Sequence, residues 1–206
     1  MSRPVPPPRA PLSTVVAGHR IVTSLHLVSP KSPELSELEF GLIIFSHAFT
    51  RWTVRCMAAA GCPDIAALDV LVLHHVNNQS QEKKLADICF VLNVDDTHVV
   101  SYALKKLASL GLVDSSKRGK EVFFATTARG REVCERYRQV RETCLLPGFA
   151  GSDEDNARLG DAASLLRTLS GRYDQAARAA SASLFTSLGA TTDAELPRRR
   201  AAKGAK

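Results

Sequence analysis

Several features that would place this chain in common classes are missing from its sequence. No run of about 18 apolar residues without charge occurs, so no segment is predicted to span a membrane. Prolines and Arg9 interrupt the apolar residues near the N-terminus, which argues against a secretion signal. There is no glycine-rich phosphate loop, no nucleophile elbow and no recognisable Ser/His/Asp spacing, so the chain is not expected to be an enzyme, and no cofactor is expected.

The five cysteines also exclude some classes. Their number is odd and none forms a C-x-x-C pair, which argues against a disulfide scaffold or a structural zinc site and favours a reducing, cytoplasmic location. Cys56 and Cys89 fall on apolar helix faces, so buried, inert thiols are favoured over oxidant sensors. His74 and His75 would point about 100° apart on a helix, a poor chelating pair, so no metal site is expected.

Charge and proline are concentrated at the ends of the chain. The net charge is +6, of which residues 1–20 supply +3 and residues 198–206 supply +5, so the remainder is −2. Residues 1–33 hold seven of the ten prolines and are predicted to be a disordered arm. Residues 186–206 are predicted to be a disordered basic tail, which leaves residues 34–185 as the folded domain. Because the basic charge lies mostly in the tails, it argues only weakly for nucleic acid.

Two long heptad stripes flank the centre of the chain. Apolar residues recur at alternating steps of three and four over residues 34–60, and a second stripe follows over residues 154–184. The first stripe consists of Leu35, Leu38, Leu42, Phe45, Phe49, Trp52, Cys56 and Ala59, and the second contains Leu166, Leu169 and Tyr173. Packing within one subunit would explain them, but a dimer interface is favoured, since so long an apolar stripe rarely finds enough cover in one small subunit.

The central segment from Gln81 to Val133 predicts a winged helix-turn-helix. Two apolar helical segments are followed by a glycine, a strand, a charged turn, a second strand and another helix. These are Lys83–Leu92, Asp95–Leu110, Gly111, a strand from Leu112, the turn 117–120, Val122–Thr126 and a helix that Thr127 caps. A helix offered to a groove beside a basic hairpin is a DNA-binding arrangement.

The second helix of this motif has one apolar and one polar face. Val100, Leu104 and Leu107 are spaced to face the core. The opposite face carries the candidate DNA-binding residues Thr97, His98, Ser101, Tyr102 and Lys105. Asp95 is expected to cap the helix, and together with Asp96 it places two carboxylates where they would repel phosphate.

The hairpin tip is the second candidate contact. Lys117, Arg118 and Lys120 are close together on a short turn, where Arg118 could enter a minor groove and the two lysines could meet phosphates. An exposed hairpin can also carry charge for solubility alone. The position directly after a helix-turn-helix favours the DNA-binding interpretation.

These residues resemble the MarR family of winged-helix transcriptional regulators. The resemblance is carried by Leu85-Ala86, by Val99–Val113, by the basic hairpin and by Thr127–Val133, which is similar to the family's Leu-Thr-x-x-Gly-Arg-Glu with Thr126 in place of Leu. It implies a mainly α fold with a small β-hairpin wing, and long N- and C-terminal helices that interlock in a homodimer. In such a dimer the two winged motifs read a pseudo-palindromic DNA sequence. Many members of the family also bind a small-molecule effector. The family's Asp-x-Arg is missing from the wing, and nothing in the sequence identifies an effector.

The sequence therefore predicts a homodimeric, sequence-specific regulator of transcription that binds double-stranded DNA. The alternative is a winged-helix module that binds protein without specific DNA binding. The nearly neutral body of the chain and the two neighbouring carboxylates motivate that alternative.

Overall fold

The computed structural model of the chain describes residues 21–149 and 151–192. They form two compact units, with the division after Leu145. Residues 1–20 of the predicted N-terminal arm and residues 193–206 of the predicted basic tail lie outside the described residues. No helix within the described ranges is long and apolar enough to cross a membrane.

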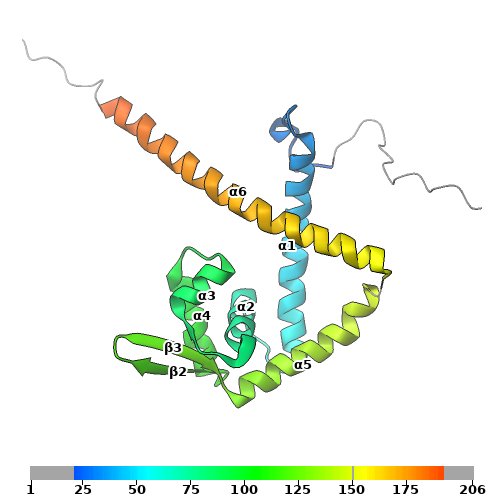
Figure 1. The fold of residues 1–206 in the computed structure, drawn as a ribbon, viewed down its shortest axis with the longest axis vertical. Helices are drawn as coiled ribbons and strands as arrows, with labels where there is room; N and C mark the ends of the chain where they lie inside the picture. Colours follow the sequence, from blue (N-terminus) through cyan, green and yellow to red (C-terminus); the bar gives the residue numbers. More distant parts are fainter. Residues whose placement is uncertain (1–20, 150, 193–206) are drawn as a thin grey trace, which may run out of the picture. The chain divides into compact units, whose positions relative to one another are not determined.

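The first unit contains a winged helix-turn-helix preceded by a long helix and followed by another (Figure 1). Its elements are η1 (Leu25–Leu27), α1 (Pro33–Ala59), α2 (Ala67–Asn77), η2 (Asn78–Ser80), β1 (Lys83–Lys84), α3 (Leu85–Leu92), α4 (Thr97–Ser109), β2 (Val113–Arg118), β3 (Glu121–Thr126) and α5 (Ala128–Cys144). The second unit contains η3 (Leu146–Gly148) and the long helix α6 (Asp153–Thr192). The predicted fold class, mainly α with a small hairpin wing and long terminal helices, is confirmed.

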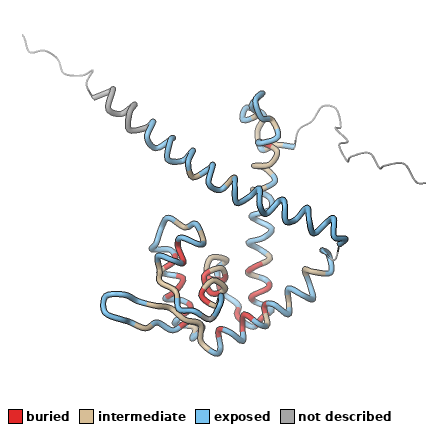
Figure 2. The backbone as a smooth tube through the Cα atoms, viewed as in Figure 1, coloured by how far each residue is buried: buried red, intermediate tan, exposed pale blue. Residues whose placement is uncertain are grey.

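The hydrophobic core lies where α1, α2, α4 and α5 meet. Figure 2 shows buried backbone on α2, on α4, on the C-terminal end of α1 and on the first half of α5. Met57 of α1 and Leu73 of α2 have no exposed surface, and Leu107 of α4 has none either. The preceding part of α1 is different, since Ile43, Ile44, Phe45 and Phe49 are all exposed. The heptad stripe of α1 therefore joins the core only near its C-terminal end.

A buried carboxylate ties α2 to α4. Asp69 is only 6% exposed, and its Oδ2 accepts a hydrogen bond of 2.8 Å from the backbone N–H of Ala66 at the start of α2. The same oxygen forms an ion pair of 3.1 Å with Nζ of Lys106 on α4. A buried charge is tolerated when it is paired and hydrogen-bonded, as Asp69 is here. The ion pair fixes the start of α2 against α4.

The helix boundaries correct two sequence predictions. Lys83 and Lys84 do not belong to the first helix of the motif but form a short strand opposite Phe124 and Phe123, because β3 offers them a backbone partner far along the chain. Asp96, not Asp95, caps α4, since its Oδ1 accepts a hydrogen bond of 2.9 Å from the N–H of His98. Gly111 ends α4 as predicted, with a left-handed φ of +68°.

The three strands form an antiparallel sheet in the order β1-β3-β2. The wing is the β2–β3 hairpin, in which Val113 pairs with Thr126 and Arg118 pairs with Glu121 (Figure 1). The turn is shorter than predicted, because Lys117 and Arg118 belong to β2 and only Gly119 and Lys120 connect the strands. Gly119 supplies the positive φ of +61° that so tight a turn requires.

The start of α5 is packed against the end of α4. Thr127 caps α5 as predicted, because its Oγ1 accepts a hydrogen bond of 3.0 Å from the N–H of Gly130. The same hydroxyl donates to the carbonyl oxygen of Gly111 at 2.8 Å. A Cβ at Gly130 would overlap the carbonyl oxygen of Leu112 and would lie 2.6 Å from Cγ2 of Thr126. Glycine is therefore required here for close packing.

We predict that Gly130→Ala lowers the free energy of unfolding by about 2 kcal/mol or more, because backbone rather than a movable side chain fills the space. Chemical denaturation followed by circular dichroism measures the change. Gly160→Ala is the matched control, since nothing lies within 4 Å of the Cβ it would add to α6. The control should be neutral or stabilising by up to about 1 kcal/mol, and equal stability of the two variants would contradict the packing argument.

Candidate nucleic-acid interface

The outer face of α4 carries the residues that the sequence predicts for DNA binding. Val100, Leu104 and Leu107 are at most 2% exposed, which confirms the inner face. Thr97, His98, Tyr102 and Lys105 are exposed, and Ser101 is half-buried. The structure thus brings all five predicted residues to the solvent side of one helix.

An aromatic ring and a cation lie together in the middle of this face. Nζ of Lys105 is 5.4 Å from the centroid of the Tyr102 ring, within the range of a cation–π contact. Tyr102 is nevertheless 69% exposed. Val99 is also exposed, at 39%, although sequence reasoning did not single it out. In the pair Val99-Val100 only the second valine is buried, and the outward position of the first follows from the 100° step between helix neighbours.

The two carboxylates before α4 are not equivalent. Asp96 accepts a backbone hydrogen bond at the start of the helix, where a negative charge is stabilised by the helix dipole. Asp95 is exposed and does not cap the helix. The concern that both carboxylates repel phosphate therefore applies mainly to Asp95.

The wing is held against β1 by two ion pairs around one aromatic ring. Nη2 of Arg118 lies 2.6 Å from Oε2 of Glu82. Nζ of Lys84 lies 2.6 Å from Oε1 of Glu121. Both cations also lie over the ring of Phe123, at 5.1 Å for Arg118 and 5.3 Å for Lys84. We call these five residues the wing clamp.

The wing clamp reduces the positive charge of the hairpin that is available to a phosphate. Arg118 already has an internal carboxylate partner, so a phosphate has to compete with Glu82 for it. Within the described part of the chain Lys117 and Lys120 form no ion pair, and both are exposed. The wing's available positive charge is therefore mainly that of the two lysines. Sequence reasoning missed Glu82 and Phe123, because the contact depends on β1 pairing with β3.

A second feature of the first unit is a cavity of about 390 Å³ between α2 and α5. It is lined by His74, Asn77, Arg131, Cys134, Glu135, Tyr137, Arg138 and Arg141. The rings of His74 and Tyr137 meet edge to face, with centroids 4.5 Å apart. Burial lowers the pKa of His74, raises the pKa of Cys134 to about 11 and raises that of Tyr137 to about 12. At neutral pH these three groups are therefore uncharged.

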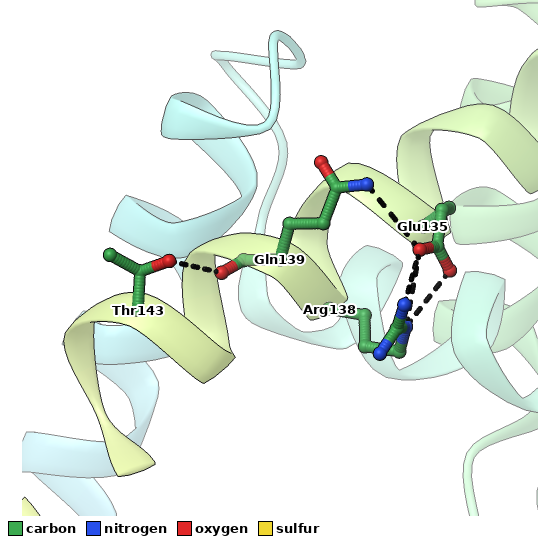
Figure 3. A network of polar contacts seen from close by, with 4 residues as sticks. All are labelled: Glu135, Arg138, Gln139 and Thr143. Atoms are coloured by element: carbon green, nitrogen blue, oxygen red, sulfur yellow. Dashed lines mark hydrogen bonds and ion pairs between the residues drawn. The ribbon is translucent and has the colours of Figure 1, made fainter. Parts of the chain in front are cut away.

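The charged rim of this cavity is partly neutralised along α5. Figure 3 shows Arg138 donating to both carboxylate oxygens of Glu135, with Nε 3.0 Å from Oε2 and Nη2 2.6 Å from Oε1. Gln139 also donates to Glu135, and Thr143 donates to the carbonyl oxygen of Gln139. The hydrogen bond from Arg138 lowers the pKa of Glu135. This surface network stabilises the helix and leaves Arg131 and Arg141 as the other cations of the rim.

Cys56 and Cys89 are buried, as the sequence predicts. Cys56, Cys62, Cys89 and Cys134 are buried, and burial raises the pKa of each thiol. A raised pKa keeps them protonated and poorly nucleophilic. Cys144 is exposed. No group of three or more potential metal ligands occurs among the residues that the structure describes.

Comparison with known proteins identifies the class first. Residues 65–130 match the family model of the winged helix DNA-binding domain. This range runs from the residues before α2 through the wing to the start of α5, so it contains the whole candidate interface. A comparison with curated protein sequences gave no match.

Solved structures then identify the type of winged helix. The MarR-family transcriptional regulator from Rhodococcus sp. RHA1 is 14% identical with a TM-score of 0.53, covering 63% of this chain and 91% of its own. AbfR of Staphylococcus epidermidis is 17% identical with a TM-score of 0.56, covering 68% and 95%. CouR from Rhodococcus jostii RHA1, solved bound to p-coumaroyl-CoA, is 13% identical with a TM-score of 0.54, covering 64% and 90%. The chain has the fold of the MarR-family regulators, as its sequence resemblance implied. An effector for this chain remains a prediction.

We predict that Glu82→Gln strengthens binding to duplex DNA of random sequence and makes log K fall more steeply with log salt, by about one unit of slope. The reason is that Arg118 becomes available to a phosphate once its internal carboxylate is neutral. Fluorescence anisotropy over a salt series measures both effects. Glu132→Gln is the matched control, because it neutralises the partner of Arg136 on α5, outside the wing. An unchanged slope for Glu82→Gln would show that Arg118 takes no part in binding.

Proposed function

We propose that this protein is a homodimeric, sequence-specific DNA-binding regulator of transcription. The observation that carries the proposal is the outer face of α4, with its exposed hydroxyl, imidazole, phenol and ammonium groups beside the lysines of the wing. The family match over residues 65–130 supports the same conclusion, because that domain is of the DNA-binding kind.

In the proposed complex each α4 lies in a major groove and each wing lies along the flanking backbone. Two subunits place their α4 helices in successive grooves, about 34 Å apart, which requires a pseudo-palindromic operator. Thr97, His98, Ser101 and Tyr102 contact base edges, while Lys105, Lys117 and Lys120 contact phosphates. Arg118 joins them when a phosphate displaces Glu82.

Exposed apolar residues on the two long helices support the homodimer. On α1, Leu35 is 38% exposed, Phe45 60% and Phe49 44%, and Leu38, Leu42 and Trp52 are half-buried. On α6, Leu166 is 38% exposed, Tyr173 is 41% exposed and Leu169 is half-buried. Apolar stripes of this length are unfavourable in water, and a second copy of the chain would cover them.

A charge reversal tests the role of the wing. We predict that Arg118→Glu combined with Lys120→Glu weakens binding to a selected duplex at least about tenfold and lowers the salt slope, because the phosphate contact of Lys120 is lost and Arg118 is no longer available to a phosphate. Anisotropy titrations with duplexes enriched from a randomised pool provide the measurement.

The control for this reversal carries the same change of charge elsewhere. Arg167→Glu combined with Arg178→Glu makes this change of charge at two exposed positions of α6. Both positions lie on the side of the helix away from Leu166 and Tyr173. This variant should bind nearly as the parent does. If the wing variant also keeps its affinity, the wing does not contact DNA.

The dimer has its own test. We predict that Phe45→Asp combined with Phe49→Asp produces soluble monomers, because two carboxylates would have to be desolvated in the interface. Light scattering gives the molar mass. Phe90→Asp is the control, since Phe90 is 85% exposed on α3, outside both stripes. A double variant that keeps the parent's dimer mass would refute the proposed interface.

One observation favours the alternative of a protein-binding module. Phe90 and Val91 on α3 are 85% and 59% exposed, and Asp87 of the same helix is also exposed. An exposed aromatic residue beside a carboxylate suits a protein contact better than a phosphate contact. If no duplex is enriched from the randomised pool, this alternative replaces the DNA-binding proposal.

A further inference from the structure

Two large apolar side chains lie on the outer face of α4, and the core does not use them. Val99 is 39% exposed and Tyr102 is 69% exposed, whereas the inner face is already closed by Val100, Leu104 and Leu107. Residues three apart on a helix are neighbours on its surface, so Val99 and Tyr102 form one small apolar patch. We call it the α4 apolar patch.

The side chains that usually read purines are missing from α4. Its sequence, THVVSYALKKLAS, contains no arginine, asparagine or glutamine. Arginine is the commonest bidentate reader of guanine, and asparagine and glutamine read adenine in the same way. One of the two lysines, Lys106, forms an ion pair with Asp69, and the other, Lys105, lies over the ring of Tyr102. Because the proposed complex assigns Lys105 to a phosphate, hydrogen-bond readout by α4 falls to Thr97, His98, Ser101 and the Tyr102 hydroxyl.

The major groove offers one apolar feature that could meet the α4 apolar patch. The C5-methyl group of thymine projects into this groove, and apolar side chains contact it. We propose that Val99 and Tyr102 recognise thymine methyl groups, so that each half of the operator carries thymines at two nearby positions. This inference rests on the proposed function, and it names the bases that the proposed interface selects.

The surroundings of the patch fit this assignment. Lys105 lies over the Tyr102 ring, so its ammonium group is within reach of the backbone next to the base that the ring would contact. Lys106, which is exposed and lies two turns after Val99 on the same side of α4, is held by Asp69 of α2, which fixes the rotation of α4 and with it the direction of Val99. The exposed Asp95 disfavours phosphate nearby but leaves an apolar contact unaffected.

Replacing thymine by uracil tests the proposal, because it removes only the methyl group and keeps every hydrogen-bonding group. The probe is a duplex enriched from a randomised pool, in which each deoxythymidine is replaced in turn by deoxyuridine. We expect about fourfold weaker binding at one or two positions in each half-site, the effect of exposing one methyl group. The remaining thymines should be insensitive to the replacement.

Substitutions on α4 assign the methyl contacts. Val99→Ala and Tyr102→Ser should each abolish the uracil effect at one position and leave it at the other. Val91→Ala is the matched control, since it truncates another exposed valine, 59% exposed on α3, and should leave all uracil effects unchanged. The uracil series on the parent protein is decisive by itself if a variant fails to fold.

The outcomes separate this inference from the function on which it rests. Enrichment of a specific duplex that tolerates uracil at every position would overturn thymine recognition and leave the proposed function standing. Uracil effects that persist in both α4 variants would overturn the assignment to Val99 and Tyr102. Failure to enrich any duplex would overturn the proposed function, and this inference with it.

Discussion

The packing of α4 on α2 is the constraint on which the candidate interface depends. Val100, Leu104 and Leu107 are closed into the core, and Lys106 reaches the buried carboxylate of Asp69. A shift of one residue would turn the helix by about 100° and would bring polar side chains into the core. The direction of every residue on the outer face is thus fixed by apolar packing and by one ion pair to a buried carboxylate. A preorganised surface of this kind loses little entropy when it binds.

Electrostatics around the interface is more balanced than the net charge of +6 suggests. Arg118 and Lys84 each have a carboxylate partner, and both lie over Phe123, so much of the charge of the wing serves its own attachment to β1. Exposed ion pairs of this kind contribute at most about 1 kcal/mol, so a phosphate can displace Glu82 at small cost. Lys117 and Lys120 need no such exchange. The wing is therefore suited to adjustable rather than permanent phosphate contacts.

Features that depend on neighbouring residues could be predicted from the sequence better than features that depend on residues far apart along the chain. Gly111 and Thr127 were interpreted correctly, because a helix end and a helix cap depend on a few neighbouring residues. The inner and outer faces of α4 followed from a 3.6-residue period. The sequence could not reveal that Lys83 and Lys84 form a strand, because their partner β3 lies about 40 residues further along the chain. The pairing of Glu82 with Arg118 was missed for the same reason.

Adjacent identical residues show a different limit of prediction from sequence. The sequence offers Asp95 or Asp96 as the cap of α4, and Val99 or Val100 as the buried valine. In each pair two identical residues stand side by side, so composition cannot separate them. For the valines the period of the helix does, since Val100 shares a face with Leu104 and Leu107. For the aspartates the backbone decides, because only Asp96 has its carboxylate at the N–H of His98. The outward direction of Val99 is thus a consequence of burying Val100, and this is why an apolar residue lies on the outer face of α4.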